Sequence, residues 1–395
     1  LSPAFSPIPL RPMAARIHPI PFAQWDLGLD RTLLIAGPCS AESHGQVLAT
    51  AEGIARNAPQ VKVFRAGVWK PRTRPGGFEG IGEQALPWLA EVKERYGLLT
   101  ITEVATPQHV EAALRGGVDM LWVGARTTPN PFSVQAIADA LAGVDIPVFV
   151  KNPVNPDLQL WTGALERLFN AGLTRVAAIH RGFHWFGRSP YRNHPMWELP
   201  VRLKAAFPEL EMIGDPSHIA GERSLLQGIA QQALDLNFSG LMIEAHHSPA
   251  EAKSDAAQQL DPAALALLLN GLSFRRSSAD GPLRDELQEH RDLIDRLDEE
   301  ILQKMAARME ISGRIGAFKQ AHNIAILQPA RWRRIMQAQH ALAKELGLSP
   351  SFVQALMDAV HDESIRKQTD VWEQADRKAN GQVSKKTGSA SKRRS

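Results

Sequence analysis

The sequence holds a single cysteine, Cys39, among its 395 residues. A lone thiol excludes an internal disulfide and leaves three roles open: a small buried hydrophobe, a nucleophile or a metal ligand. The chain also lacks an apolar run of about 18 residues, which argues against a membrane-spanning helix. Its first residues do not join a charged segment to an apolar one, as a secretion signal does. We therefore expect a cytoplasmic protein.

The chain has little net charge, +3 in total. Residues 381–395 hold five basic and no acidic groups, so the other residues carry a net charge of −2 (3 minus 5). We expect this low-complexity tail, taken as 376–395, to be disordered and solvated rather than to bind nucleic acid. The 44% hydrophobic and 22% charged residues are typical of a globular protein. No nucleic-acid or membrane partner is predicted.

Short apolar runs recur between residues 33 and 246, each followed by loop residues and a helix-like stretch. Eight such βα units predict an α/β fold, a closed parallel (β/α)8 barrel. A helical pattern over 260–272 completes the eighth unit. The runs are 33–37, 61–67, 98–104, 120–125, 147–152, 175–182, 211–216 and 240–246.

Charged or reactive side chains stand at the end of every one of these runs. Barrel enzymes build their active sites at the carboxyl ends of the strands, so we expect these side chains to converge on one mouth. A solvated loop charge would explain any one of them, but eight strands together favour a site. The residues are Cys39, Arg65, Glu103, Arg126, Lys151, Arg181, Asp215 with His218, and Glu244 with His246.

Two kinds of chemistry can be separated within and beside this set. Five cations that face one cavity repel one another unless an anion is bound, which predicts a multiply charged ligand such as a phosphorylated carboxylic acid. The cations are Arg65, Lys70, Arg126, Lys151 and Arg181. A thiol, an imidazole and two carboxylates form a mixed set that suits a divalent ion, although their spacing fits no compact zinc motif. These four are Cys39, His218, Glu244 and Asp255.

Several separated motifs carry a family resemblance. They are Ala36-Gly37-Pro38-Cys39-Ser40-Ala41-Glu42, Phe64-Arg65-Ala66-Gly67 with Lys70-Pro71-Arg72-Thr73, Gly124-Ala125-Arg126, Asp215-Pro216-Ser217-His218, Met242-Ile243-Glu244-Ala245-His246 and Ser254-Asp255. In this order, over about residues 30–273, they resemble the 3-deoxy-D-arabino-heptulosonate-7-phosphate (DAHP) synthases. Those enzymes condense phosphoenolpyruvate with erythrose 4-phosphate, release phosphate and open the shikimate pathway to aromatic amino acids.

The resemblance implies a role for each matching residue. One divalent ion per barrel, manganese first and iron, cobalt or zinc as alternatives, would be held by Cys39, His218, Glu244 and Asp255. The phosphoenolpyruvate clamp would consist of Arg65, Lys70, Arg126, Lys151 and Arg181. Arg72 and Thr73 would contact erythrose 4-phosphate, and either Lys70 or Lys151 could move protons. The related 3-deoxy-D-manno-octulosonate-8-phosphate synthases read Lys-Ala-Asn-Arg-Ser-Ser at this motif, which favours erythrose 4-phosphate over arabinose 5-phosphate.

The strand pattern stops after Phe274. Residues 275–282 are polar and turn-rich, which predicts a linker. Three helices are predicted beyond it, over 283 to about 322, 329–346 and 350–374, with Ser349 capping the third and Pro350 at its first position. The first helix exceeds 25 residues and has apolar residues at helical spacing. Because so small a domain cannot bury this surface, we expect a homodimer or higher homo-oligomer.

Residues along these helices resemble the all-helical chorismate mutases, which rearrange chorismate to prephenate. The matching positions are Arg291 with Asp298, Ala307-Arg308, Gly316-Ala317-Phe318-Lys319, Arg331, and Ser364-Ile365-Arg366-Lys367-Gln368. Arg308 and Lys319 fall on nearly one helix face, while Arg291 points about 100° away. In that family the long helices of two subunits interlock, so the resemblance implies an intertwined dimer in which Arg291 serves the partner's site.

In that resemblance the substrate's carboxylates are held by Arg291, Arg308 and Arg331. Lys319 and Gln368 would donate hydrogen bonds to the ether oxygen, where negative charge grows in the transition state. Ser364 belongs to the same substrate-binding set. This chain departs from the family pattern at two acidic positions, which Gln328 and Trp332 occupy, and the strength of the mutase activity is left open.

Three hypotheses follow. The first is a bifunctional enzyme with feedback inhibition of the synthase through the helical domain. The second is a DAHP synthase whose helical domain mainly binds prephenate or chorismate as an effector and dimerises the chain. The third, a structural or nucleic-acid-binding protein with a decayed barrel, leaves the intact ligand and cation sets unexplained. The expected domains are a 1–29 extension, a 30–273 barrel, a 274–282 linker, a 283–375 mutase-like domain and a 376–395 tail.

Overall fold

The computed structural model describes residues 19–25, 28, 32–70, 77–275 and 282–390, with the backbone alone for 282, 376 and 378–390. Contacts divide the chain into two compact units, Leu1–Ser277 and Ser278–Ser395. Within the described part of the chain, no helix is long and apolar enough to span a membrane.

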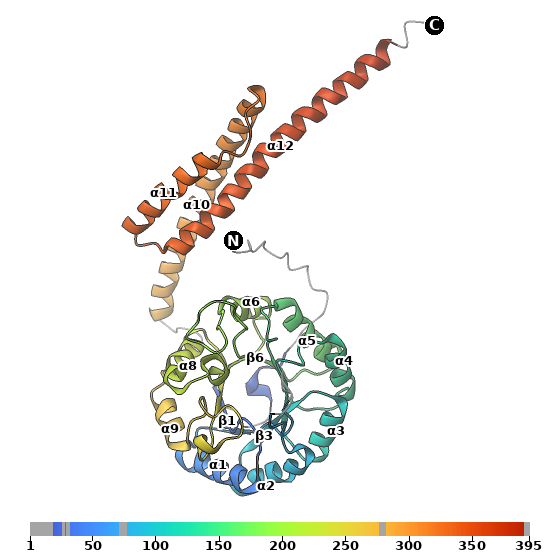
Figure 1. The fold of residues 1–395 in the computed structure, drawn as a ribbon, viewed down its shortest axis with the longest axis vertical. Coiled ribbons are helices and arrows are strands. Elements are labelled where there is room, and N and C mark those ends of the chain that lie inside the picture. Colours follow the sequence, from blue (N-terminus) through green and yellow to red (C-terminus); the bar gives the residue numbers. More distant parts are fainter. Residues whose placement is uncertain (1–18, 26–27, 29–31, 71–76, 276–281, 391–395) are drawn as a thin grey trace. The chain divides into compact units, whose positions relative to one another are not determined.

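Eight parallel strands close into a barrel in the first unit, in the order in which they follow along the chain (Figure 1). The last strand returns to the first, with Leu33 of β1 beside Gly240 of β8. The strands are β1 Leu33–Gly37, β2 Val63–Arg65, β3 Leu99–Val104, β4 Met120–Val123, β5 Val148–Lys151, β6 Val176–His180, β7 Met212–Gly214 and β8 Gly240–Glu244. The predicted (β/α)8 barrel is confirmed.

Helices surround the barrel as an outer layer (Figure 1). Several begin at a side-chain cap: Thr106 and Asn130 accept backbone N–H groups at the first turns of α3 and α4, where proline occupies the first position. The helices are α1 His44–Asn57, α2 Leu86–Tyr96, α3 Pro107–Arg115, α4 Pro131–Ala140, α5 Leu158–Asn170, α6 Glu198–Ala206, α7 Pro216–Ala220, α8 Leu226–Asp235 and α9 Pro262–Asn270, with short 3-10 turns η1 Phe22–Gln24, η2 Gly82–Ala85, η3 Arg223–Leu225 and η4 Pro249–Glu251.

The apolar core lies in two separate places, inside the barrel and between the barrel and its helices. Strand alternation explains the division, because successive side chains point to opposite faces of a sheet. Ile35, Trp122 and Phe149 belong to the inner cluster, whereas Phe64 and Val150 belong to the outer one. The interior of the barrel is therefore packed, and the chemistry is confined to its ends.

Residues 19–25 close the amino-terminal end of the barrel. Ile20 N donates to Thr174 O just before β6, and Phe22 N donates to Glu211 Oε1 just before β7. Trp25 is fully buried, with its ring 4.7 Å from Phe22 between centroids. The sequence did not indicate whether the amino-terminal extension covers this end, and the structure places its last residues there as a plug.

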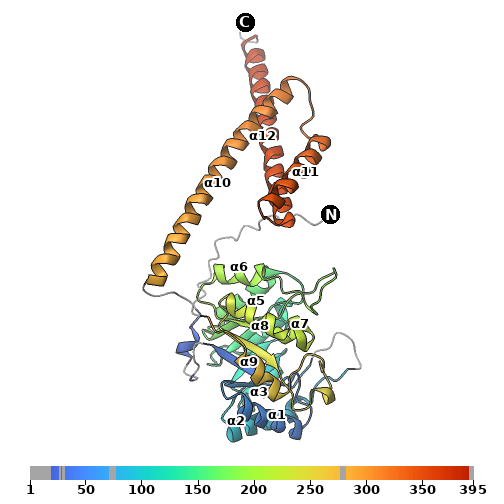
Figure 2. The ribbon, with the colours of Figure 1, turned by 90° about the vertical axis from the view of Figure 1, so that its left-hand side faces the viewer.

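The second unit consists of three helices, α10 Pro282–Ala321, α11 Pro329–Glu345 and α12 Pro350–Ala390. The third packs against the other two (Figure 2). Gly316 allows α10 and α12 to approach closely, and Trp372 Nε1 donates to its carbonyl oxygen over 2.8 Å. Ser349 Oγ accepts the N–H of Phe352, as expected for a cap before Pro350.

Helix α12 is longer than the sequence predicts. It continues to Ala390, beyond the predicted end near residue 374, and residues 391–395 of the predicted tail lie outside the described residues. The low apolar content of the end of α12 argues against its packing into a core. A segment can still form a helix without such packing, because helix formation also depends on the intrinsic helix propensity of its residues. No proline follows Pro350, so no residue of that type interrupts the helix.

Candidate active site

The carboxyl ends of the strands bring most of the predicted residues together. Arg65, Lys151 and Glu244 are the last residues of β2, β5 and β8, and Cys39 follows β1 by two positions. Asp215 follows β7 directly and caps α7, where its carboxylate accepts the N–H of His218. Because all eight strands run in one direction, these ends lie at one mouth.

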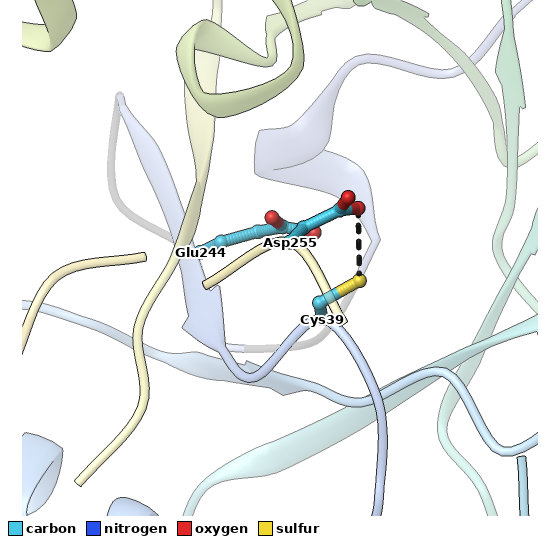
Figure 3. A group of neighbouring side chains, drawn as sticks. All are labelled: Cys39, Glu244 and Asp255. Carbon is cyan, nitrogen blue, oxygen red and sulfur yellow. Dashed lines mark hydrogen bonds between the residues drawn. The ribbon is translucent and has the colours of Figure 1, made fainter. Parts of the chain in front are cut away.

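Three potential metal ligands lie close together at this mouth. One ligand atom from each of Cys39, Glu244 and Asp255 lies within 4.8 Å of the others. Figure 3 shows the Cys39 sulfur facing the Asp255 carboxylate, and the two atoms are 3.3 Å apart. Asp255 has a left-handed backbone, φ 51°, a strained conformation that is common at functional sites.

His218, the fourth predicted ligand, borders this group. Its Nε2 lies 3.6 Å from Glu244 Oε1, and its Nδ1 lies 2.9 Å from Asp215 Oδ1. The carboxylate on Nδ1 fixes the ring and leaves Nε2 directed toward the three-ligand group, an arrangement typical of metal-binding histidines. Burial lowers the pKa of His218, although Asp215 opposes this, so the neutral form is favoured.

The electrostatics of the group suit a cation. Burial, reinforced by Glu244, raises the pKa of the Cys39 thiol to about 12. Burial would also raise the pKa of Asp255, but His218 and Arg192 outweigh it and lower that pKa. Glu244 Oε1 is buried without a hydrogen-bond partner within the described residues. A thiol, an unsatisfied carboxylate oxygen and an imidazole nitrogen form a donor set that fits a divalent metal ion, which would also favour the thiolate.

Arg65 stands beside this group as a fully buried cation. Its Nη2 lies 3.1 Å from Glu244 Oε1, yet none of its side-chain nitrogens has a hydrogen-bond partner among the described residues. A buried guanidinium with unused donors is costly unless a ligand supplies acceptors. The arrangement therefore indicates an anion-binding position next to the metal-ligand group.

The other predicted cations surround the same mouth. Lys151 Nζ pairs with Asp215 at 2.8 Å, and Lys70 Nζ donates to the carbonyl oxygen of Cys39 at 2.9 Å. Burial lowers the pKa of Arg181 to about 10; Asp215 opposes this shift, and the nearby Arg192 and Arg126 add to it. Accumulation of like charge at Arg181 fits a site that receives an anion. Arg72 and Thr73 lie outside the described residues.

Sequence reasoning missed four side chains that support these groups. Gln258 Nε2 donates to Glu244 Oε2 at 2.6 Å, and Gln259 Oε1 accepts the N–H of Cys39 at 3.0 Å. Arg192 donates to Asp255 at 2.9 Å. Asn193 accepts from Arg181 at 2.7 Å. All four lie in loops after β6 or β8, and only that loop position could have suggested them.

The helical unit gathers a second polar cluster around α10 and α12. Arg308 donates to the Ser364 hydroxyl, and Gln368 Nε2 donates to Ser312 Oγ at 3.3 Å. Gln368 Oε1 is buried with no hydrogen-bond partner in the described part of the chain. Lys319 Nζ donates to the carbonyl oxygen of Ile326 at 2.6 Å. This cluster contains four of the predicted mutase residues.

Trp332 and His361 stack beside this cluster, with ring centroids 4.0 Å apart. Burial lowers the pKa of His361, and the positive charges of Arg308 and Lys319 contribute, although Asp362 opposes them. Gln328 precedes α11 as its N-cap residue without a side-chain cap bond. An aromatic pair therefore lies near the position where the resemblance would place an acidic group.

Two predicted arginines are exposed. Arg291 is exposed, and because α10 is one continuous helix, it lies about 25 Å from Arg308 along the axis. Arg331 is exposed in the first turn of α11. One chain alone does not bring Arg291 to the cluster.

One mouth of a closed barrel holds a ligand set for a cation and a buried guanidinium whose nitrogens have no hydrogen-bond partner among the described residues. These features define an enzyme class: barrel enzymes that act on anionic substrates beside a metal-ligand group. The family models specify it further. Residues 23–273 match the DAHP synthetase I family, and residues 290–369 match chorismate mutase type II. The chain therefore belongs to the DAHP synthetase I family, and it carries a chorismate mutase domain after the barrel.

Similar proteins include both kinds of sugar-phosphate synthase. Phospho-2-dehydro-3-deoxyheptonate aldolase from Thermotoga maritima is 29% identical over 261 residues, 64% of this chain and 73% of that protein. A 2-dehydro-3-deoxyphosphooctonate aldolase from Desulfatibacillum aliphaticivorans is 30% identical over 62% of this chain and 93% of its own. The crystal structure of the Thermotoga maritima DAHP synthase has a TM-score of 0.55 and 27% identity, with 67% of this chain and 70% of that chain covered.

These matches confirm the bifunctional interpretation of the sequence. The barrel is a DAHP synthase domain and the helical region is a chorismate mutase domain, so the substrates are phosphoenolpyruvate, erythrose 4-phosphate and chorismate. DAHP synthases generally depend on a metal, in keeping with the ligand group at the mouth.

Proposed function

We propose that the barrel binds phosphoenolpyruvate through Arg65, Lys70, Arg126, Lys151 and Arg181. The observation that carries the proposal is the fully buried Arg65, whose donors have no hydrogen-bond partner within the described residues. A bidentate guanidinium contact with a carboxylate or phosphate would use these donors. Arg72 and Thr73 stay proposed contacts to erythrose 4-phosphate.

Cys39, His218, Glu244 and Asp255 would hold the divalent ion, for which we propose manganese, with iron, cobalt or zinc as alternatives. The ion, when bound, would act as a Lewis acid on the aldehyde oxygen of erythrose 4-phosphate. Gln258 and Arg192 orient the carboxylates of Glu244 and Asp255 by hydrogen bonds. The support for this assignment is the proximity of soft and hard donors beside an unsatisfied carboxylate oxygen.

Lys151 is the residue we propose for proton transfer. Burial lowers its pKa and Arg65 adds to this, while Asp215 opposes both. Its Nζ shares Asp215 with His218, so the carboxylate links an ammonium group to an imidazole ring. A lysine with a lowered pKa releases a proton more readily near neutral pH, as a general acid requires.

The barrel proposal is tested by paired assays on metal-free and metal-restored protein. DAHP formation should disappear after chelation and return with Mn²⁺, because the ligand group belongs to the synthase site. Chorismate rearrangement should be unchanged in both samples, since a pericyclic reaction needs no metal. DAHP synthesis that persists in metal-free protein would contradict the assignment. Turnover of arabinose 5-phosphate alone would contradict the choice of aldehyde.

For the helical unit we propose that Arg308, Lys319, Ser364 and Gln368 bind chorismate, with Arg331 on a carboxylate. Gln368 and Lys319 would stabilise the negative charge that develops on the ether oxygen. Gln368 Nε2 donates one hydrogen to Ser312 Oγ, and the second amide hydrogen is the one that would be donated to the ether oxygen.

Arg291 would complete the site of a partner subunit in an intertwined homodimer. About 25 Å separates it from Arg308 within one chain. The amino-terminal half of α10 exposes several large apolar side chains, which need a cover in water. They include Leu293, Ile294, Leu297, Ile301 and Leu302.

Mixing two inactive variants tests the shared site. Arg291→Ala and Arg308→Ala should each lack mutase activity as homodimers. After subunit exchange, a mixed dimer holds one site with both substitutions and one with neither, so partial activity should return. Activity that stays absent after exchange, with exchange verified by mass spectrometry, would contradict the dimer proposal. Full turnover in Arg308→Ala alone would contradict the catalytic assignment.

An effector role for the helical unit is the second candidate. Trp332 stacks on His361 where an acidic substrate contact is common in the resembling family, which favours binding over fast turnover. We propose that prephenate or chorismate bound there inhibits the synthase. Synthase kinetics of the full chain that do not respond to prephenate would contradict this regulation. We also propose a cytoplasmic location and domain limits of 30–273 and 283–375.

A further inference from the structure

Trp122 lies inside the barrel next to two proposed phosphoenolpyruvate ligands. It is fully buried on β4. Its ring centroid is 5.1 Å from Arg65 Cζ and 5.5 Å from Lys151 Nζ, within the range of cation–π contacts. An ordinary core residue of a barrel has no charged neighbours of this kind.

The strand register explains how one ring reaches both cations. Trp122 is paired with Glu103 on β3 and with Phe149 on β5, and residues paired in this way face the same side of a sheet. Lys151 lies two residues after Phe149 and therefore also points inward. The Trp122 ring thus lies on the inner face of the barrel, within contact range of both cations.

The indole N–H of Trp122 engages a carboxylate in the same place. Nε1 donates to Glu103 Oε2 at 3.2 Å. On the other side of Glu103, a Cβ atom on Gly124 would lie only 2.0 Å from Glu103 Oε1. Glycine at this position therefore leaves the space that the carboxylate fills, and Trp122 holds the carboxylate in that space.

We infer that Trp122 is a positioning residue of the phosphoenolpyruvate site: its ring supports Arg65 and Lys151, and its N–H keeps Glu103 from pairing with them. The inference rests on the proposed roles of those two cations. Arg65 already lies 3.1 Å from Glu244 Oε1, and Lys151 pairs with Asp215, so a further carboxylate would occupy the donors that remain for an incoming anion. An aromatic face stabilises the cations and leaves those donors free. The unused nitrogens of Arg65 among the described residues fit this account.

Two substitutions separate the two contributions. Trp122→Phe keeps an aromatic face and removes the N–H, while Trp122→Leu removes both. Trp161→Phe is the matched control, because Trp161 is equally buried and its Nε1 donates to the Val150 carbonyl outside the barrel interior. Each full-length variant is loaded with Mn²⁺. Calorimetry then measures the Kd of phosphoenolpyruvate without aldehyde, and steady-state assays measure both KM values.

We expect the Kd of phosphoenolpyruvate to rise about tenfold in Trp122→Leu, which is about 1.4 kcal/mol. In Trp122→Phe it should rise about threefold. The KM of erythrose 4-phosphate and the mutase activity should stay within about twofold of wild type, as should all values for Trp161→Phe. If Trp122→Leu fails to fold, Trp122→Phe alone decides the question by the same comparison.

Two results would overturn the inference: an unchanged Kd in the decisive variant, or equal losses for both substrates. The first would show that the ring and its N–H do not support the clamp. The second would indicate general damage to the barrel. Failure of the underlying proposal is recognised separately, because the Arg65→Met variant would then bind phosphoenolpyruvate as tightly as wild type.

Discussion

Replacing Gly316 by alanine should damage the mutase site through one methyl group. A Cβ at Gly316 would lie 2.8 Å from Gln368 Cα and 3.0 Å from its Cβ and Cγ. Since ordinary contacts start near 3.4 Å, α12 must move by several tenths of an ångström at the residue that faces the reacting ether oxygen in our proposal. Overpacking of this kind costs about 1–3 kcal/mol, and alanine's better helix propensity returns about 1 kcal/mol.

Gly313, one turn earlier on α10, provides the control. Its added Cβ would meet only Val371 Cγ2, at 3.9 Å, so alanine there should raise stability by up to about 1 kcal/mol and leave activity unchanged. A displacement near 1 Å in a catalytic group costs about 100-fold, so Gly316→Ala should lower mutase kcat/KM at least about tenfold. Chorismate consumption followed by absorbance measures this in both variants. Equal mutase activity in the two would refute the reasoning.

Two further predictions concern the barrel. Burial lowers the pKa of His180 to about 3 in the folded protein. Below pH 6.5, the ordinary pKa of histidine, the unfolded chain therefore binds a proton at this residue that the folded protein does not bind. The free energy of unfolding is thus at its full value above pH 6.5 and decreases as the pH falls below it. From pH 7.5 to 5 the loss is about 2 kcal/mol, and His180→Gln should remove that share of the pH dependence of urea unfolding; an unaltered slope would contradict it. Trp25→Ala should cost about 3–5 kcal/mol and lower the Tm of the barrel by roughly 10 °C. Trp185 is half-exposed, so Trp185→Ala should leave the Tm nearly unchanged. Equal Tm values in the two variants would show that the plug contributes no stability.

The barrel could be predicted because each of its strands leaves a local trace. An apolar run such as Leu33–Gly37 is visible in the sequence, and parallel topology forces all strand ends to one mouth. The convergence of Cys39 and Glu244 follows from that topology, and Asp255 joins them from the loop after β8.

The residues that hold the site in place could not be predicted in the same way. Gln258 and Arg192 are ordinary loop residues until the fold brings them to Glu244 and Asp255. Trp122 reads as a core residue of a strand, because its role depends on side chains from three other strands. The predicted α12 was too short, because the composition of a segment indicates whether it can pack into a core but not whether its backbone is helical.

The central claim is that one chain carries a metal-dependent synthase site around Cys39 and a separate, metal-independent mutase site. Paired assays of Cys39→Ala, with Mn²⁺ supplied in excess, test it most directly. The account predicts that DAHP synthesis is lost while chorismate rearrangement continues at the wild-type rate. Metal-dependent DAHP synthesis at the wild-type rate in this variant, or loss of both activities in a folded protein, would contradict it.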